Sequence, residues 1–338
     1  MKPSIYLSIL EVYFMEKEIV YLKEANSYED ILKKEHNEMP LFFKRLFFLY
    51  KNIFNIITEK NVEENKIWIL PIKEKYSINK IEKILRKNLK HTDMYLISNK
   101  LKENKICKIL EDLEQEYITE EKIKKYLIFE VLKYILKLSN KELSDLELTI
   151  LVNDTSNINI YLIEELAKRV KTVKIVSLKI YKFKKLEEKL YNEYGIPIQF
   201  SNSYRKSLEK SKLIINFDFN EFEINEYEIF NNAIVINCIK DNIRIKAKLF
   251  DGIVVNSYNI KYKKELMNKF KTMQVNENYN KLMLYASTIE EKNIGEVYKK
   301  VEEDSVSISG LVGNNGILCN KEIKEKVRKI FTKKQVVI

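Results

Sequence analysis

The chain contains few of the residues on which many metal sites, disulfide frameworks and phosphate-binding loops depend. Its 338 residues include 6 glycines, 4 prolines, 3 cysteines and 2 histidines. Cys107, Cys238 and Cys319 are far apart and odd in number, which argues against a disulfide framework or a cysteine-based metal site. No apolar run reaches the ~18 residues that a membrane-spanning helix needs. We therefore expect a cytoplasmic protein without a metal site.

The first residues also lack the small-residue cleavage site of a signal peptide. Residues 1–14 are apolar but include Glu11, and Met15 opens a more ordinary cytosolic start, Met-Glu-Lys-Glu. We interpret residues 1–14 as an optional or misassigned extension.

Positive charge exceeds negative charge, with 60 Lys and Arg against 49 Asp and Glu and a formal net charge of +11. Such an excess raises a nucleic-acid partner as an alternative. The basic residues are mostly interleaved with acids, as where Lys122, Lys124 and Lys125 follow Glu120 and Glu121. Because mixed charges are typical of solvated helix faces, a nucleic-acid partner is not the favoured interpretation.

Residues 1–118 predict a smaller α/β domain. Strands are expected at 18–21, 66–71 and 93–98, and helices at 41–54, 78–89 and 105–113. These residues contain no glycine, which excludes a glycine-rich phosphate loop from this part of the chain.

The helix predicted at 41–54 is strongly aromatic and carries Lys44, Arg45 and Lys51. Such a pattern allows a membrane-surface helix. A core helix with one basic edge is commoner, so we expect this helix to be buried and expect no membrane partner.

The centre of the chain alternates apolar runs with helical segments. The expected strands are 148–152, 173–177, 196–201, 213–217, 233–238 and 252–256. This rhythm predicts an open, mostly parallel, doubly wound sheet of about six strands in a domain spanning 141–275. A connecting helix is expected within 119–140. Helices in 276–338 are expected to pack back on the N-terminal domain, with a glycine-containing surface turn at 309–316 before the last of them.

This central pattern resembles the Rossmann-type NAD(P)-binding superfamily, in the two-domain arrangement of shikimate-dehydrogenase-like proteins. The resemblance is carried by the strand Thr149–Val152, the helix Ile158–Val170, the strand Val173–Val176, and the helix Phe183–Tyr194 with Gly195 at its end. The later strands that begin at 196, 212 and 233 continue it. The resemblance implies a Rossmann-like fold and, as an alternative function, an NAD(P)-dependent oxidoreductase.

The first strand-to-helix turn departs from the family pattern. Members use G-x-G-x-x-G there, because only glycine lets backbone N–H groups approach the pyrophosphate closely. This chain instead has Asn153, Asp154, Thr155, Ser156 and Asn157. These residues are candidate cofactor-binding groups at a helix N-terminus, and the preferred interpretation is that they only cap the helix. The turn resembles a degenerate cofactor site.

Five further polar residues lie where predicted strands end. They are Ser177, Lys179, Asn216, Asp218 and Asn237. The carboxyl ends of parallel strands line the ligand crevice of an open α/β sheet, so these side chains and the turn outline a candidate crevice.

No catalytic group can be named from the sequence. Both histidines, His36 and His91, precede the central domain, which excludes a Ser-His-Asp or Cys-His pair there. We therefore expect a non-catalytic protein that binds a small ligand or a protein partner and holds no cofactor. NAD(P) binding is the alternative, and a homodimer is left open.

Overall fold

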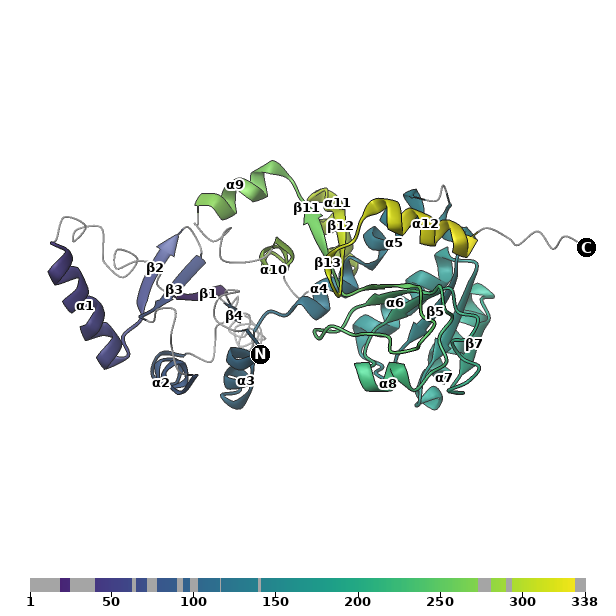
Figure 1. The fold of residues 1–338 in the computed structure, drawn as a ribbon, viewed down its shortest axis with the longest axis horizontal. Helices are drawn as coiled ribbons and strands as arrows, with labels where there is room; N and C mark the ends of the chain where they lie inside the picture. The colour runs from purple at the N-terminus through teal and green to yellow at the C-terminus, as the bar shows by residue number, and fades with distance from the viewer. Residues whose placement is uncertain are drawn as a thin grey trace, which may run out of the picture. The chain divides into compact units, whose positions relative to one another are not determined.

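The computed structural model describes residues 19–24, 40–62, 65–71, 78–89, 94–97, 103–115, 117–138, 141–272, 281–289 and 294–331. It divides into two compact units (Figure 1). Unit 1 comprises Met1–Ile118 and Asn268–Ser287, and unit 2 comprises Thr119–Met267 and Thr288–Ile338. The proposed extension at 1–14, His36 and His91 lie outside the described residues.

Unit 1 contains a four-stranded sheet with the order β2-β3-β1-β4. Strand β1 pairs in parallel with β3 and β4, and β2 forms an antiparallel edge on β3. The elements are β1 (Ile19–Glu24), α1 (Leu41–Phe54), β2 (Thr58–Val62), β3 (Asn65–Leu70), α2 (Ile78–Asn88), β4 (Met94–Ile97) and α3 (Glu103–Asp112). The smaller α/β domain expected from the sequence is present, and β2 is a strand that the sequence analysis missed.

Helices cover both faces of this sheet. On one face Trp68 and Tyr95 pack in a core with apolar residues of α2 and α3, including Ile84 and Leu110. The opposite face is covered by α10 (Lys281–Ala286), all of whose residues from 282 to 285 are buried. The Tyr21 hydroxyl lies 3.0 Å from Ser287 Oγ and ties β1 to the end of that helix.

Helix α1 begins after Pro40 as expected, but the prediction that it is a core helix is wrong. Only Lys44 and Phe48 are buried. Eight of its apolar side chains are 46% to 67% exposed, namely Leu41, Phe42, Phe43, Leu46, Leu49, Tyr50, Ile53 and Phe54. The helix packs through its polar side, where Lys51 donates to Thr58 Oγ1 at 2.6 Å and Asn52 donates to the Pro71 carbonyl. Within the described residues, no helix is long and apolar enough to cross a membrane.

Unit 2 is built on a six-stranded, all-parallel sheet with the order β10-β9-β8-β5-β6-β7. Counted along the chain, this is the 3-2-1-4-5-6 arrangement of the Rossmann fold. The strands are β5 (Glu147–Leu151), β6 (Thr172–Val176), β7 (Ile198–Ser201), β8 (Leu213–Asn216), β9 (Ile234–Asn237) and β10 (Ile253–Val255). The predicted fold class, strand number and approximate strand positions are confirmed.

Burial explains why these strands read as apolar runs rather than as alternating patterns. Every residue of β8 and β9 is buried, because both faces of a parallel sheet are covered. The helices between the strands are α6 (Asn157–Arg169), η6 (Ile180–Phe183), α7 (Lys184–Tyr194) and α8 (Glu221–Asn225). Helix α7 ends at Gly195, whose φ of 66° is left-handed and therefore favours glycine.

The connecting helix expected within 119–140 is two helices. They are α4 (Glu120–Tyr126) and α5 (Ile128–Lys137), interrupted at Leu127, which has φ −91° and ψ 8°. The Leu127 side chain is completely buried, so the interruption between the two helices is packed inside unit 2. The amphipathic pattern continues across Leu127, so the interruption could not be predicted from the sequence.

Within the C-terminal region, α10 belongs to unit 1 and Thr288–Ile338 belongs to unit 2. Strand β12 (Ser307–Gly313) pairs with β11 (Ser257–Lys261) and with β13 (Gly316–Ile317). The expected surface turn at 309–316 is therefore largely strand and hairpin, and Gly316 supplies the left-handed φ of 105° at its tip. The remaining helices are α9 (Lys264–Thr272), α11 (Ile294–Glu303) and α12 (Asn320–Phe331).

Candidate functional site at the carboxyl ends of the parallel strands

The strand order places a switch point between β5 and β8. From β5 the chain proceeds to β6 and β7 on one side of the sheet, and β8 then starts the other half on the opposite side of β5. Ligands of open α/β sheets bind outside the carboxyl ends of the strands at such a point. The turn at Asn153 and Asp154 follows β5, and Asp218 follows β8, so the fold brings these sequence-predicted residues together.

The Asp218 carboxylate occupies the backbone N–H groups of this turn. Its Oδ1 and Oδ2 accept from Asn153 N at 2.8 and 3.0 Å, and Oδ2 also accepts from Asp154 N at 2.7 Å. Burial raises the pKa of Asp218 above its usual range, although the two backbone donors and the nearby Lys125 oppose that shift. An internal carboxylate thus sits where a Rossmann turn offers its amides to a phosphate.

The Asn153 side chain closes the other side of the turn. Its Oδ1 accepts from Ser177 Oγ at 3.2 Å and from Leu178 N at 2.9 Å. Ser177 Oγ in turn accepts from Lys179 N at 3.0 Å. Ser177 is buried, whereas Lys179 is exposed and takes part through its backbone. These contacts join the carboxyl ends of β5 and β6 directly.

The remaining turn residues lie at the start of α6. Thr155 and Ser156 are half-buried and Asn157 is exposed. Ser156 occupies the N-cap position but its side chain makes no capping hydrogen bond. The buried Asn159 instead donates from Nδ2 to the Asp154 carbonyl at 3.1 Å. The expected side-chain cap is therefore absent at Ser156, and one helical turn further on a buried asparagine holds the turn.

A ladder of buried asparagines crosses the ends of the other strands. Asn216 Nδ2 donates to Asn237 Oδ1 at 3.0 Å, Asn237 Nδ2 donates to Asn256 Oδ1 at 3.0 Å, and Asn256 Nδ2 donates to Asn314 Oδ1 at 2.9 Å. The first three residues are at most 1% exposed. We call Asn216, Asn237, Asn256 and Asn314 the asparagine ladder.

Backbone carbonyls of nearby loops accept the remaining side-chain N–H groups of the ladder. Asn216 also donates to the Phe219 carbonyl at 2.7 Å, Asn237 to the Asp241 carbonyl at 2.8 Å, and Asn256 to the Ile243 carbonyl at 3.2 Å. Each of the three buried amides therefore uses both of its N–H groups inside the protein. Asn216 and Asn237 were predicted to line the crevice, but the structure commits them to joining β8, β9 and β10.

Helix α4 lies over the neighbouring strand ends. Lys124 is 1% exposed and donates from Nζ to the Ile239 carbonyl at 2.9 Å, directly after β9. The Tyr258 hydroxyl donates to the Lys124 carbonyl. Lys125 pairs with Glu121 at 2.9 Å, and its Nζ lies 6.0 Å from the centre of the Phe217 ring. Helix α4 of unit 2 thus covers part of this edge of the sheet.

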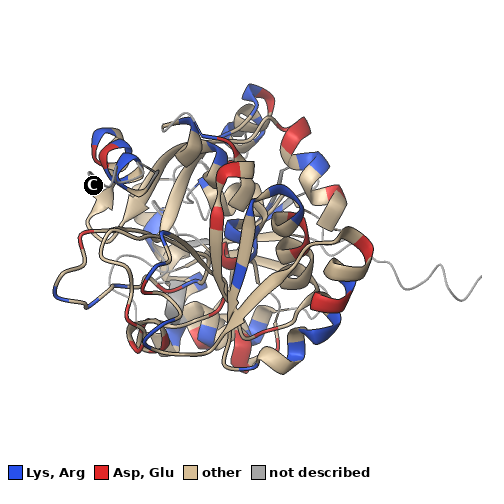
Figure 2. Ribbon diagram, turned by 90° about the vertical axis from the view of Figure 1, so that its right-hand side faces the viewer, with Lys and Arg blue, Asp and Glu red and all other residues tan. Residues whose placement is uncertain are grey.

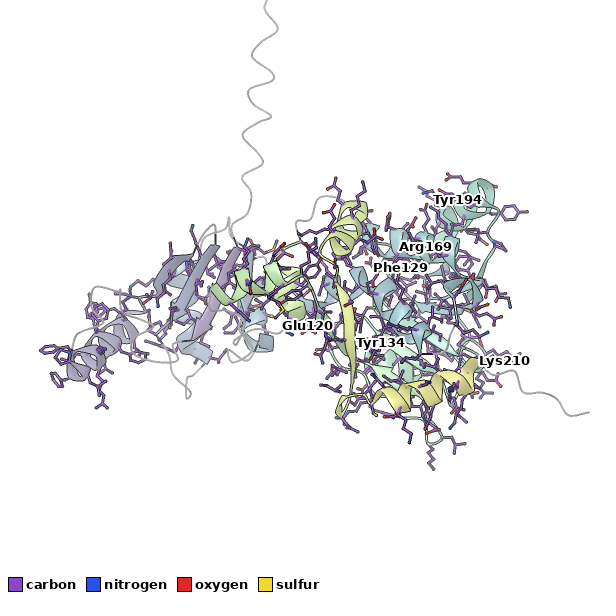
Figure 3. All side chains as sticks on the ribbon, turned by 90° about the horizontal axis from the view of Figure 1, so that it is seen from above. Glu120, Phe129, Tyr134, Arg169, Tyr194 and Lys210 are labelled. Carbon is purple, nitrogen blue, oxygen red and sulfur yellow. The ribbon has the colours of Figure 1, made fainter. Side chains whose placement is uncertain are left out.

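Helix α6, whose first turn borders the site, is fixed by charged contacts at its far end. Glu164 accepts from Lys168 at 2.8 Å and from Lys189 of α7 at 2.7 Å. The Arg169 guanidinium lies 4.7 Å from the centre of the Phe129 ring of α5, and both residues are labelled in Figure 3. These contacts hold α6 against its neighbours on the sheet.

Four further residues at this site were not predicted from the sequence, namely Asn256, Asn314, Lys124 and Lys125. Asn256 follows a strand just as Asn216 and Asn237 do, and the repetition of asparagine at three strand ends was a readable signal. The lysines gave no such signal, because they belong to a helix far earlier in the chain. Only the tertiary fold brings them to the sheet.

Little reactive chemistry is available at this edge. Burial raises the pKa of the Cys238 thiol to about 12, which disfavours the nucleophilic thiolate. Across the part of the chain that the structure describes, no three His, Cys, Asp or Glu side chains gather as a metal ligand set. In Figure 2, acidic and basic segments alternate along the helices facing the viewer. Lys168 and Arg169 both pair with Glu165 on helix α6.

Comparisons with known proteins find only low similarity. No family model matches the chain, and no curated protein matches it. Among solved structures it is similar to L-tryptophan dehydrogenase from Nostoc punctiforme, with 9% identity, a TM-score of 0.32, and coverage of 93% of this chain and 88% of that one. It is also similar to a shikimate dehydrogenase in complex with NADP+, with 11% identity, a TM-score of 0.31, and coverage of 94% and 96%. A third similar structure is ornithine carbamoyltransferase from Pyrococcus furiosus, with 9% identity, a TM-score of 0.27, and coverage of 69% and 78%.

Proposed function

We propose that unit 2 is a non-catalytic Rossmann-like scaffold and that the protein acts by binding a partner rather than by transferring hydride. The observation that carries this proposal is the Asp218 carboxylate on the N–H groups of Asn153 and Asp154. The function therefore corresponds to an interaction protein with a degenerate cofactor site.

The residues at the turn do not fit a dinucleotide. A pyrophosphate bound there would need the amides that Asp218 already occupies, and it would meet the negative charges of Asp218 and Asp154. Displacing Asp218 would break its hydrogen bonds to the turn and leave a half-buried carboxylate to find other partners. After β6, where family members place an acid for the ribose hydroxyl, the chain has Ser177-Leu178-Lys179.

The other polar groups at this edge of the sheet also make contacts inside unit 2. The asparagine ladder joins three strand ends, Lys124 binds the Ile239 carbonyl, and the Cys238 thiol is kept protonated by burial. The asparagine amides are not titratable groups, and Lys124 already donates to a backbone carbonyl. This supports a scaffold over an acid–base catalyst.

Isothermal titration calorimetry with NAD⁺, NADH, NADP⁺ and NADPH tests the proposal. We expect no heat of specific binding for the wild type at millimolar cofactor. One-to-one binding with a micromolar dissociation constant would overturn the proposal and establish the oxidoreductase alternative as the better one.

The variant Asp218→Ala tests whether the Asp218 carboxylate itself prevents the turn from binding phosphate. If the carboxylate alone blocks the site, the variant gains weak binding of NAD⁺ or inorganic pyrophosphate that the wild type lacks. Asp154→Ala removes an exposed carboxylate from the same turn and serves as the matched control. Equal cofactor binding by wild type and Asp218→Ala would show that Asp218 does not obstruct the turn.

A further inference from the structure

Helix α1 of unit 1 presents an apolar surface that the scaffold in unit 2 does not explain. We define the α1 apolar face as Phe42, Phe43, Leu46, Leu49, Tyr50, Ile53 and Phe54, each between 46% and 67% exposed. Phe222 and Leu249 are exposed singly on other elements, and α7 exposes only the pair Tyr191 and Tyr194. Scattered apolar residues are normal on a surface, whereas a continuous apolar patch marks an interaction site.

The face follows helical geometry. Phe42, Leu46, Leu49 and Ile53 recur at intervals of four, three and four residues, so they form one stripe along the helix. Phe43, Tyr50 and Phe54 form an adjoining stripe. The two stripes together make one apolar side of the helix, unbroken by any charged residue.

The opposite side of α1 anchors it to unit 1. Lys51 donates to Thr58 Oγ1 at 2.6 Å, and Asn52 donates to the Pro71 carbonyl. From α2, Lys87 donates to the Phe54 carbonyl at 2.7 Å, and Asn88 donates to the Asn55 carbonyl at 3.1 Å. A helix normally buries its apolar side, so α1 is held in the reverse orientation by polar contacts with its own unit.

Positive charge borders the α1 apolar face. The helix contains Lys44, Arg45 and Lys51 and no acidic residue. Arg45 is exposed beside one stripe, and the exposed Lys87 of α2 adds positive charge at the C-terminal end of the helix. An apolar helix side flanked by basic residues is the pattern of a helix that lies in the interface of an anionic membrane.

The charges also discriminate between occupants. Pairing two copies of α1 face to face would bring together two cationic borders with no acid on either helix to compensate them, which disfavours a second copy. A lipid surface complements both features, because anionic headgroups pair with the basic border and acyl chains accept the aromatic side chains. We propose that α1 docks unit 1 onto an anionic lipid surface, with the helix axis in the membrane plane.

Vesicle co-sedimentation of the full chain tests this proposal. Vesicles of phosphatidylcholine with phosphatidylglycerol should bind the protein, and binding should weaken as salt is raised. Vesicles of phosphatidylcholine alone should bind much less. The double variant Phe42→Gln/Ile53→Gln should lower the partition coefficient by about tenfold or more, because two side chains lose their transfer into the lipid.

Matched variants separate docking from general effects. Phe222→Gln/Leu249→Gln removes two equally exposed apolar residues of unit 2, and it should leave vesicle binding unchanged. Arg45→Glu should weaken binding to anionic vesicles. Tyr50→Trp should show a blue shift of its emission when anionic vesicles are added, while the buried Trp68 contributes a constant background.

Several outcomes would overturn the proposal. These are a wild type that binds neither vesicle type, equal binding to both types, or undiminished binding by Phe42→Gln/Ile53→Gln. A concentration-dependent dimer that this double variant abolishes, in a protein that does not bind vesicles, would assign the face to a second copy. The emission of Tyr50→Trp could already be blue-shifted without vesicles and remain unchanged when they are added. That result would show that another segment of the chain covers the face.

Discussion

Asp218 illustrates how one side chain can change what a common turn does. The turn after β5 keeps the position of a Rossmann phosphate-binding turn, and its amides still point toward an anion. That anion is a carboxylate from the loop after β8. Internal occupation stabilises the turn without glycine and leaves no need for a cofactor to order it.

We predict that Asp218→Ala lowers the free energy of unfolding at neutral pH by about 2 kcal/mol, because two backbone donors lose a charged acceptor. Urea denaturation measures the change, and native-state hydrogen exchange should show faster exchange at the amides of Asn153 and Asp154. The control Asp154→Ala should change the unfolding free energy much less. Unchanged protection of both amides in Asp218→Ala would contradict the hydrogen bonds described above.

The pH dependence of stability should reveal the raised pKa of Asp218. Burial makes the folded protein hold this proton at higher pH than the unfolded chain does. The contribution of Asp218 to the unfolding free energy is therefore largest at low pH, and it falls as pH rises between its usual pKa and the raised one. Denaturation of wild type and Asp218→Ala at several pH values measures this contribution. If the difference in unfolding free energy between the two proteins grew with pH in that window, the pKa of Asp218 would be lowered by folding and not raised.

At the scale of elements, contacts between helices and between strand ends define the edge of the sheet. The asparagine ladder links β8, β9 and β10, and it reaches β12's hairpin through Asn314. Glu164 links α6 to α7 through Lys189. Asn216, Asn237 and Asn256 are buried together, whereas the buried Glu164 pairs with lysines that are partly solvated. Loss of a partner should therefore cost more in the ladder than at Glu164.

Replacing Asn237 tests the ladder. Asn237→Leu keeps a side chain of similar size but leaves Asn216 Nδ2 and Asn256 Oδ1 each short of a partner. We expect a loss of about 3 kcal/mol in the free energy of unfolding, measured by urea denaturation. Asn202→Leu makes the same change at an exposed loop position and should be nearly neutral. If both variants lost a similar amount of unfolding free energy, the hydrogen bonds of the ladder would not be the cause of the loss in Asn237→Leu.

Replacing Glu164 tests the link between α6 and α7. Burial raises the pKa of Glu164, but hydrogen bonds and charge from Lys168 and Lys189 outweigh it, so the pKa is lowered overall. Glu164→Gln should cost about 1 kcal/mol, because both lysines are partly solvated. Because the pKa of Glu164 is lower in the folded protein, its carboxylate stabilises the fold at pH values above the pKa of the unfolded chain. The loss of unfolding free energy in Glu164→Gln should therefore disappear as pH falls through the folded pKa. Thermal melts across that range measure this.

At the scale of the whole molecule, the chain leaves unit 2 within α9, contributes α10 to unit 1, and then returns to unit 2. The return completes the sheet β11-β12-β13 and adds α12, whose Lys326 and Lys329 pair with Asp251. Lys212 also donates to the Ile330 carbonyl at 2.9 Å. Unit 2 therefore depends on residues from both sides of α10.

Deleting residues 288–338 should destabilise unit 2 more than unit 1. The deletion removes the partner of β11 and exposes Tyr258 and Ile260, which are buried against it. Hydrogen exchange with mass spectrometry should show lost protection in β11 and β10 and retained protection in β1 and β3. The reverse pattern would contradict the assignment of this region to unit 2.

The sequence alone determined the parallel sheet of unit 2, because fully buried strands leave uninterrupted apolar runs at crossover spacing. It also determined the glycine-free turn and the polar strand ends. Tertiary structure decided what those residues contact: Asp218 reaches a turn 64 and 65 residues earlier in the chain. It also decided that α1 turns its apolar side outward and that residues 288–338 join unit 2. Periodicity reveals that a helix has two different sides, but only long-range packing decides which side the protein covers.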